Sequence, residues 1–315
     1  MARIDASLSV VIPLFNKRST IIRAINSVMA QLVAPDAIIV IDDGSCDGGA
    51  ELVRNTFDNE ISLIQQQNSG VSVARNAGLK LARTEFVAFL DADDFWEPNF
   101  VKNFRDSLLS CSFGIWACRY YFEGVSGRRL AFSSNGPWPK GVLCKTDYFK
   151  YSLKSPIVTS SSVVVRRTAL AKIGGFPVGV TVGEDLITWA RLLDDEVLYI
   201  SSDPSAVYCF DPKRNEHISS MKVSPPEELL QFFQARSKSG SYEQRIYYLV
   251  LLSRALSALQ FGAKSASVFL RLVRISCSVL ISREVPIKGK GLALIITARA
   301  GVSIMQSIIR SMKFK

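Results

Sequence analysis

The feature that most constrains this chain is an apolar run that leads directly into three carboxylates. Residues 86–98 read Phe-Val-Ala-Phe-Leu-Asp-Ala-Asp-Asp-Phe-Trp-Glu-Pro. An apolar run of this length is typical of a strand buried on both faces of a sheet. Asp91, Asp93 and Asp94 then follow at its carboxyl end, which is the edge where open α/β sheets bind ligands.

The three acids admit two interpretations. Carboxylates this close together repel one another, so a positive group is expected among them. A divalent metal carried on a nucleotide diphosphate fits, because Mg and Mn prefer carboxylate and phosphate oxygens. The simpler interpretation is a helix N-terminus, with Asp94 as the cap and Pro98 in the first turn. The two are compatible, since a cap at Asp94 leaves Asp91 and Asp93 for a ligand.

Strands and helices alternate over the first hundred residues. We expect strands at 8–13, 37–41, 61–65 and 86–90, and helices at 20–32 (with Ser19 as cap), 49–57 and 71–83. This alternation favours a parallel sheet with right-handed crossovers. The later pattern predicts a hairpin from 113–123 and 129–133, strands at 163–166, 197–200 and 206–210, and helices at 169–173 and 186–193.

Positive charge is concentrated in the last third of the chain. Of the 38 Lys and Arg, fourteen lie from Pro225 onward against four Glu, so the first 224 residues carry 24 charges of each sign. Pro225-Pro226 marks a boundary, and we expect one domain over 1–224 and a basic helical extension over 225–315. A basic segment indicates an acidic partner: anionic lipid, nucleic acid or a phosphorylated substrate.

The apolar stretches of the extension suggest contact with a membrane. Residues 292–309 are apolar but hold Arg299 near the middle, which would cost a full span about 2.5–3.5 kcal/mol. Amphipathic helices lying on the cytoplasmic face of a membrane are therefore favoured. A helical cap packed on the first domain, or a dimer interface, is the alternative. Nucleic-acid binding is disfavoured, because no recognition motif accompanies the charge.

Cysteine usage favours a reducing cytosol. The chain has six Cys and one His, and none of the cysteines forms a Cys-x-x-Cys pair. Neither a zinc cage nor a disulfide framework is indicated. Residues 1–9 are too polar and too short for a signal peptide.

Four short motifs follow one another in the first hundred residues. They read Leu-Ser-Val-Val-Ile-Pro-Leu-Phe-Asn from residue 8, Ile-Asp-Asp-Gly-Ser-Cys-Asp-Gly from 41, Asn-Ser-Gly-Val-Ser-Val-Ala-Arg-Asn-Ala-Gly from 68 and Leu-Asp-Ala-Asp-Asp from 90. Together they resemble the family 2 glycosyltransferases, inverting enzymes of the GT-A fold that use nucleotide-sugar donors. Gly174-Gly175-Phe176 and Gly183-Glu184-Asp185 extend the similarity to about residue 195. The last ninety residues are not covered.

The resemblance places the nucleotide at the ends of the first two strands. Its pocket would be lined by the backbone of Pro13, Leu14 and Phe15, and Asn16 could help to close that loop. One of Asp42 and Asp43, with Asp43 preferred, would bind the base and ribose. A fixed carboxylate accepts the N3–H of uracil, a donor that cytosine lacks. The alternative is a plain Asp-Gly-Ser turn before a helix.

The next two motifs would hold the diphosphate. Arg75 and Asn76 would reach toward the nucleotide, with Arg75 bonding either to phosphate or to Asp43; the alternative is a solvated surface arginine. Asp91 and Asp93 correspond to the family's Asp-x-Asp. Asp93 would bind Mn²⁺ or Mg²⁺, and Asp91 would contact sugar, ribose or the metal through water. Trp96 is expected in the core.

The fifth motif would supply the attacking half of the reaction. The resemblance makes Asp185 the general base that takes the proton from the acceptor hydroxyl, with Glu184 beside it in the substrate site. The alternative is two acids that favour a helix N-terminus. In the loop at 213–217, Arg214 or His217 could contact phosphate or metal.

These observations predict a GT-A domain, a Rossmann-like and mostly parallel sheet with flanking helices, plus the basic extension. The predicted activity is metal-dependent inverting transfer of a sugar from a nucleotide-sugar, with UDP favoured, to a saccharide or lipid-linked acceptor. The expected setting is polysaccharide or lipopolysaccharide assembly at the cytoplasmic face of the inner membrane.

Two other functions fit the sequence less well. A sugar nucleotidyltransferase would need a Gly-rich phosphate loop after the first strand, whereas Pro-Leu-Phe-Asn-Lys from residue 13 lacks glycine. A membrane-bound scaffold that binds nucleotide-sugar without turnover is disfavoured by the presence of both Asp93 and Asp185.

Overall fold

The computed structural model describes residues 6–131, 137–152, 155–180 and 183–209, together with Arg236, Gln244, Tyr247 and Tyr248. The chain divides into two compact units. The first contains residues 1–145, 155–178 and 185–211, and the second contains 146–154, 179–184 and 212–315. Apart from those four residues, the basic extension expected over 225–315 lies outside the described part of the chain.

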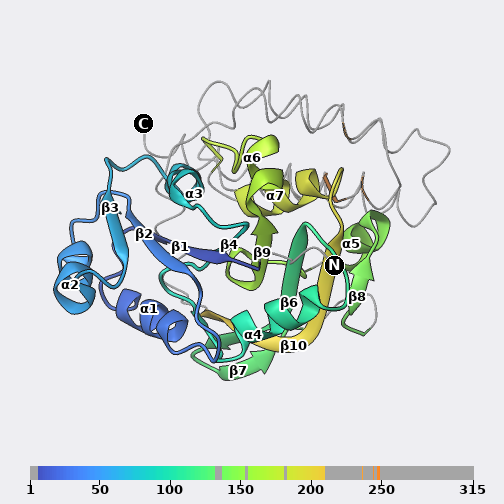
Figure 1. Ribbon diagram of the computed structural model, residues 1–315, viewed down its shortest axis with the longest axis horizontal. Helices are drawn as coiled ribbons and strands as arrows, with labels where there is room; N and C mark the ends of the chain where they lie inside the picture. Colours follow the sequence, from blue (N-terminus) through green and yellow to red (C-terminus); the bar gives the residue numbers. More distant parts are fainter. Residues whose placement is uncertain are drawn as a thin grey trace, which may run out of the picture. The chain divides into compact units, whose positions relative to one another are not determined.

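The first four strands form the parallel half of a sheet. They are β1 (Leu8–Leu14), β2 (Ala37–Asp42), β3 (Ser62–Gln65) and β4 (Phe86–Phe89), in the order β3-β2-β1-β4. Their connections are the helices α1 (Ile21–Met29), α2 (Gly49–Phe57) and α3 (Val71–Leu81) (Figure 1). All three strand pairs are parallel, so the predicted alternation is confirmed. Thr20, rather than the expected Ser19, is the N-cap of α1.

The second half makes the sheet mixed. β9 (Val163–Arg166) runs antiparallel to both β4 and β6 (Ile115–Gly124), and β10 (Leu198–Cys209) runs parallel to β6. The short strands that pair antiparallel with β6 or β10 are β5 (Phe95–Trp96), β7 (Gly127–Leu130) and β8 (Gly141–Leu143). The two strands expected over 197–210 are one strand with register shifts on either side of Pro204. Proline cannot donate to a ladder and is typical of such irregularities.

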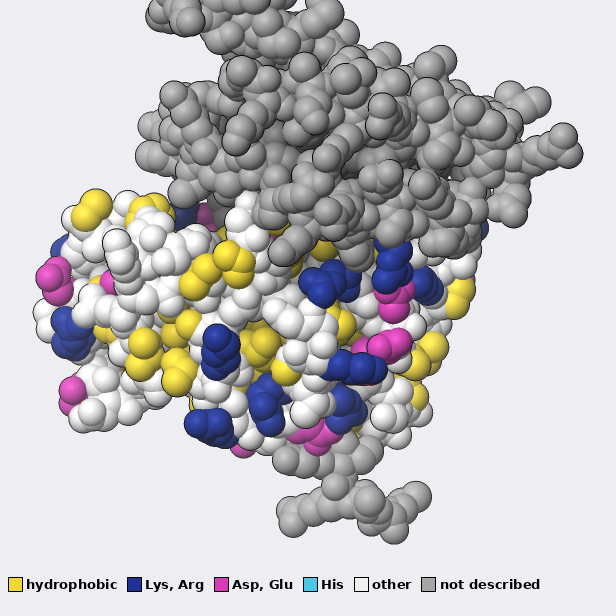
Figure 2. Space-filling model, turned by 90° about the horizontal axis from the view of Figure 1, so that it is seen from above, with side chains coloured by type: hydrophobic (Ala, Val, Ile, Leu, Met, Phe, Trp, Pro, Cys, Tyr) yellow, Lys and Arg dark blue, Asp and Glu magenta, His cyan; other side chains and the backbone are white. Residues whose placement is uncertain are grey.

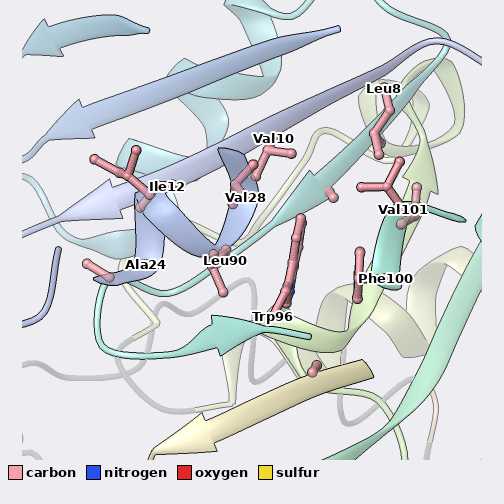
Figure 3. Packing of buried hydrophobic residues seen from close by; sticks show 14 of the residues in the cluster. Leu8, Val10, Ile12, Ala24, Val28, Leu90, Trp96, Phe100 and Val101 are labelled. Carbon is pink, nitrogen blue, oxygen red and sulfur yellow. The ribbon is translucent and has the colours of Figure 1, made fainter. Parts of the chain in front are cut away.

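Alternation along the strands sends side chains to two helical layers. One face packs against α1, α2 and α4 (Phe100–Leu108), and Figure 3 shows its labelled core residues Leu8, Val10, Ile12, Ala24, Val28, Leu90, Trp96, Phe100 and Val101. The other face carries α3, α6 (Arg167–Lys172) and α7 (Glu184–Leu192) (Figure 1). There the ring of Phe89 lies 4.9 Å from that of Phe176, which in turn lies 5.5 Å from Trp189. The period-2 pattern of β1 and β4 therefore fixes which layer each residue contacts.

In the second unit, an aromatic cluster involves α5 (Lys145–Ser152). Tyr148 and Phe149 are fully buried and pack against Tyr247 and Tyr248. The hydroxyls of Tyr148 and Tyr247 are 3.1 Å apart.

The surface of the described residues mixes charge and apolar groups. On the face shown in Figure 2, Lys and Arg side chains lie among hydrophobic and acidic ones. Among the helices that the structure describes, none is long and apolar enough to cross a bilayer.

Candidate active site

Sheet topology brings the sequence motifs to one edge. Because β1, β2 and β4 are parallel, their carboxyl ends, with the loops that follow Leu14, Asp42 and Phe89, meet there (Figure 1). β9 is antiparallel to β4, so it is its beginning that lies at this edge. A 3₁₀ turn, η1 (Ser160–Ser162), directly precedes β9 and is therefore placed beside the acids that follow β4.

At the end of β2, both acids are buried and bonded to neighbouring loops. Asp42 is 1% exposed and accepts hydrogen bonds from the Ser45 N–H at 3.1 Å and from Gln65 Nε2 at 3.1 Å. Asp43 is 4% exposed. It accepts from Gln66 Nε2 at 2.7 Å, the Ser69 N–H at 2.9 Å and the Gly70 N–H at 2.8 Å. A carboxylate offers about four acceptor positions, so three donors leave room at Asp43 for one ligand N–H.

The loop after β1 is closed by Asn16. Its backbone is left-handed, with φ of 50°, a conformation that asparagine tolerates better than most residues. The Asn16 N–H donates to Ser45 Oγ at 3.0 Å, and Asn16 Oδ1 accepts from the Cys46 N–H at 2.9 Å. The expected role of Asn16 in closing this loop is confirmed. Pro13 and Leu14 are buried at the end of β1, whereas Phe15 is 41% exposed.

Arg75 projects from α3 toward the acids after β4. It is 2% exposed, and its guanidinium lies 2.7 Å from Asp91 Oδ1 and 5.2 Å from the centre of the Phe176 ring. Arg75 was expected to bond to phosphate or to Asp43, and in the structure it pairs with Asp91. Asn76, the next residue, donates to the Phe176 carbonyl at 2.9 Å and accepts from the Phe176 N–H at 2.8 Å. Asn76 thus fastens the Gly-Gly-Phe segment to α3.

The three acids at 91–94 have different environments. Asp91 faces Arg75, and the Asp93 carboxylate lies 3.0 Å from Lys17 Nζ. Asp94 is fully buried and accepts from Ser161 Oγ at 2.5 Å and from the Cys209 N–H at 2.8 Å. Burial, and secondarily the charges of Asp91 and Asp93, raises the pKa of Asp94 well above its ordinary value.

Asp94 is not a helix cap, and that expectation is wrong. Helix α4 begins at Phe100, with Asn99 as its N-cap, and Pro98 precedes it. The segment between the acids and α4 instead forms the short strand β5, which joins the sheet by pairing with β10. Trp96 lies in the core as expected: it is 3% exposed, and its ring is stacked on Phe100 at 3.7 Å between ring centres.

The η1 serines connect the acids after β4 with Asp185. Ser161 Oγ accepts from the Asp91 N–H at 3.2 Å as well as donating to Asp94. Ser160 Oγ lies 3.5 Å from Asp185 Oδ2. Asp185 is the second residue of α7, and Glu184, which begins the helix, is 8% exposed. Asp91 and Asp185, about ninety residues apart in sequence, therefore contact adjacent serines of the same three-residue turn.

Sequence reasoning missed Lys17, Ser160, Ser161 and Arg23. Arg23 donates from α1 to the Asp93 carbonyl at 2.6 Å and lies over the Phe95 ring at 4.8 Å. The run Thr-Ser-Ser-Ser from residue 159, just before a buried strand, was a usable signal. Arg23 had none, because α1 meets the Asp93 loop only in three dimensions. Arg214 and His217 lie outside the described residues.

The acids suit a metal that is shared with phosphate. No three His, Cys, Asp or Glu side chains within the described ranges gather as a protein-only metal cage. Mg²⁺ is ordinarily held by one or two carboxylates, with substrate phosphates and water completing the shell. Asp93, 8% exposed, and Asp91 can supply that small contribution, whereas the Asp94 oxygens are directed to Ser161 and Cys209.

A mixed sheet of this kind, with its acids at the carboxyl edge, is the architecture of the GT-A fold. The chain belongs to the family 2 glycosyltransferases: residues 9–174, more than half of the chain, match the family model described as Glycosyl transferase family 2. The matched range includes the first four motifs, except for Leu8, and ends before Glu184 and Asp185.

Several individual glycosyltransferases are similar to part of this chain. The glycosyltransferase GlyA of Streptococcus pneumoniae is 29% identical over 63% of this chain and 30% of its own length. The putative teichuronic acid biosynthesis glycosyltransferase TuaG of Bacillus subtilis is 29% identical over 59% of this chain and 71% of its own. The chain spans less than half of GlyA and of the uncharacterized glycosyltransferase YibD of Escherichia coli (44%).

The fold has a solved counterpart. The crystal structure of Staphylococcus aureus TarS residues 1–349 in complex with UDP-GlcNAc aligns with a TM-score of 0.61 at 19% identity. The alignment covers 96% of this chain and 89% of that one. At this identity the likeness establishes the fold alone.

Proposed function

We propose that this protein is a metal-dependent inverting glycosyltransferase that moves a sugar from a UDP-sugar to a hydroxyl of a saccharide or lipid-linked acceptor. The observation that carries the proposal is the meeting of three sets of acids at one sheet edge. Asp43 follows β2, Asp91 and Asp93 follow β4, and Asp185 is joined to them through η1. Membership of the family supports the same activity.

The donor half of the reaction belongs to the first three motifs. Asp43, or its neighbour Asp42, accepts the uracil N3–H, and the backbone at the end of β1 encloses the nucleotide with the exposed Phe15. Arg75 holds Asp91 in place, and Asp93 and Asp91 hold the Mn²⁺ or Mg²⁺. When bound, the ion neutralises charge on the departing diphosphate, an effect worth several kcal/mol.

The acceptor half belongs to α7. Asp185 takes the proton from the acceptor hydroxyl as its oxygen attacks the anomeric carbon on the face opposite the diphosphate. The Ser160 hydroxyl, 3.5 Å from Asp185 Oδ2, steadies that carboxylate. Glu184 contributes to the acceptor side. A single displacement inverts the anomeric configuration and requires no covalent intermediate.

The decisive experiment combines a donor screen with one variant. The full-length protein is incubated with a panel of nucleotide-sugars and Mn²⁺, and release of the nucleoside diphosphate is measured with and without candidate acceptors. We expect UDP-sugars to be consumed, and Asp185→Asn to abolish transfer while UDP binding is retained. Transfer that survives in Asp185→Asn would remove Asp185 from the role of base.

The metal assignment has its own test. Calorimetric titration of UDP in Mn²⁺ and in EDTA should show tighter binding with the metal, and Asp93→Ala should remove most of that difference. UDP binding that is the same in Mn²⁺ and EDTA would overturn the metal site. The scaffold alternative predicts binding without any turnover in the screen.

For the cellular setting, we propose assembly of a bacterial surface polymer at the cytoplasmic face of the membrane. The printed names of TuaG and TarS, the latter a poly(ribitol-phosphate) β-N-acetylglucosaminyltransferase, support a surface polymer. The excess of basic residues over 225–315 supports an anionic membrane partner. The full chain should co-sediment with vesicles containing phosphatidylglycerol at low salt, and not with phosphatidylcholine alone. Equal binding to both kinds of vesicle would contradict the proposed electrostatic attraction to anionic lipid.

A further inference from the structure

Lys17 is a second cation at the candidate metal site. Its Nζ lies 3.0 Å from Asp93 Oδ2, with 34% of the Lys17 side chain and 11% of the Asp93 side chain exposed. No sequence motif assigned it a role. An ammonium at this distance competes with any metal ion that would bind to the same Asp93 oxygen.

The backbone on both sides of Lys17 is fixed. Asn16 is joined to the loop at 45–46 by two hydrogen bonds. Arg18 is joined to the same loop, through its N–H to Asp47 Oδ2 at 2.8 Å and its guanidinium to the Gly48 carbonyl at 3.0 Å. The Lys17 carbonyl accepts the N–H of Ile21 at 2.9 Å, at the start of α1. Any rearrangement of Lys17 is therefore confined to its side chain.

The backbone that carries the partner carboxylate is also held in place. The Asp93 carbonyl accepts from Arg23 at 2.6 Å, and the neighbouring Asp94 is anchored by Ser161 and Cys209. The long side chain of Lys17 thus meets the short side chain of Asp93 between two fixed backbones. Lysine is a compact charge on a flexible stem with three donors, and it is well suited to binding phosphate.

We propose that Lys17 acts as an internal counter-cation that makes metal binding depend on the donor. Without nucleotide, its ammonium pairs with Asp93 and keeps the affinity for a divalent cation low. When the nucleotide-sugar arrives with its metal, Lys17 moves from Asp93 to the diphosphate and leaves the carboxylate to the ion. This inference rests on the proposed function, because it requires the diphosphate and metal to share this edge.

The proposal requires thermodynamic coupling between UDP and the metal. If UDP draws Lys17 away from Asp93, UDP raises the affinity for Mn²⁺, and Mn²⁺ raises the affinity for UDP by the same factor. Lys17→Gln removes the competing charge at similar length. Metal binding to the nucleotide-free protein should then strengthen, and the coupling factor should shrink.

The experiment counts free Mn²⁺ by its electron paramagnetic resonance signal, with and without UDP. Without UDP, we expect Lys17→Gln to bind Mn²⁺ about tenfold more tightly than the wild type. Lys17→Arg, which keeps the charge, should remain close to the wild type. Lys102→Gln is the matched control, because Lys102 forms an exposed pair with Asp106, at 50% and 54% exposure, and should change nothing.

The outcomes separate this inference from the proposed function. Equal Mn²⁺ affinity of Lys17→Gln and the wild type without UDP overturns the role of Lys17, whatever the donor screen shows. Tighter binding that persists when Asp93→Asn is added overturns it too, since the gained site would lie elsewhere. Failure of the proposed function appears separately, as no release of nucleoside diphosphate from any sugar donor.

Discussion

The Arg75 guanidinium lies 2.7 Å from the Asp91 carboxylate, and the arginine side chain is almost completely buried. The two residues come from α3 and from the loop after β4, so the ion pair joins two neighbouring elements of the sheet edge. The Phe176 ring lies against the same guanidinium. Arg75 therefore both stabilises the fold locally and sets the position of an acid at the candidate site.

Replacing Arg75 with methionine should destabilise the protein. The change removes the guanidinium that pairs with the largely buried Asp91, and breaking such a pair costs about 3 kcal/mol. The measurement is a shift of the urea midpoint for unfolding, followed by circular dichroism. The double variant with Asp91→Asn should be less destabilised than Arg75→Met alone, because the uncompensated charge is gone. A double variant as unstable as the sum of the singles would contradict this account.

Ser160 should matter for turnover more than for donor binding. Ser160→Ala removes one of the contacts that position the Asp185 carboxylate, and we expect kcat to fall about tenfold, which is about 1.4 kcal/mol in the barrier. UDP affinity should stay unchanged in calorimetry. Ser160→Thr keeps the hydroxyl and should recover most of the activity. A drop in UDP affinity with unchanged kcat would place Ser160 on the donor side instead.

Much of the arrangement of acids at the sheet edge could be predicted from local sequence. The apolar runs that end in Asp42 and Phe89 have the composition of buried parallel strands, and topology alone then brings their acids together. Asp94 shows where local reasoning fails. A cap before Pro98 is a good local pattern, yet burial against Ser161 and Cys209, which are distant in sequence, gives Asp94 another role.

The counter-cations illustrate the same limit. Repulsion among Asp91, Asp93 and Asp94 correctly predicted positive charge nearby, but could not say which side chains carry it. Arg75 and Lys17 supply it, from α3 and from the loop after β1. Likewise, η1 joins Asp185 to the Asp91 loop only because β9 is antiparallel, and the sequence contained no signal for the direction of that strand.

The free cysteines should differ strongly in reactivity. Burial raises the pKa of Cys118 to about 12, so almost none of it is thiolate at pH 8, and its side chain is inaccessible. Cys46 and Cys144 are exposed. Mass spectrometry after brief iodoacetamide treatment at pH 8 should find Cys46 and Cys144 modified and Cys118 unmodified until urea is added. Modification of Cys118 at a similar rate in native buffer would contradict its burial.

Gly78 permits α3 to lie close to β1. A Cβ added at this position would come within 2.3 Å of Val11 Cγ1, a contact that real side chains do not make. Gly78→Ala should therefore destabilise the protein by about 1–3 kcal/mol, although alanine is the better helix former. Val11→Ala creates the missing space, so the double variant should unfold at a higher urea concentration than the sum of the single effects predicts.

Gly127→Ala is a useful comparison, because nothing lies within 4 Å of its added Cβ and any cost arises from its φ of 94° alone. If Val11→Ala gave Gly127→Ala the same rescue as Gly78→Ala, the effect would be unrelated to the contact between α3 and β1.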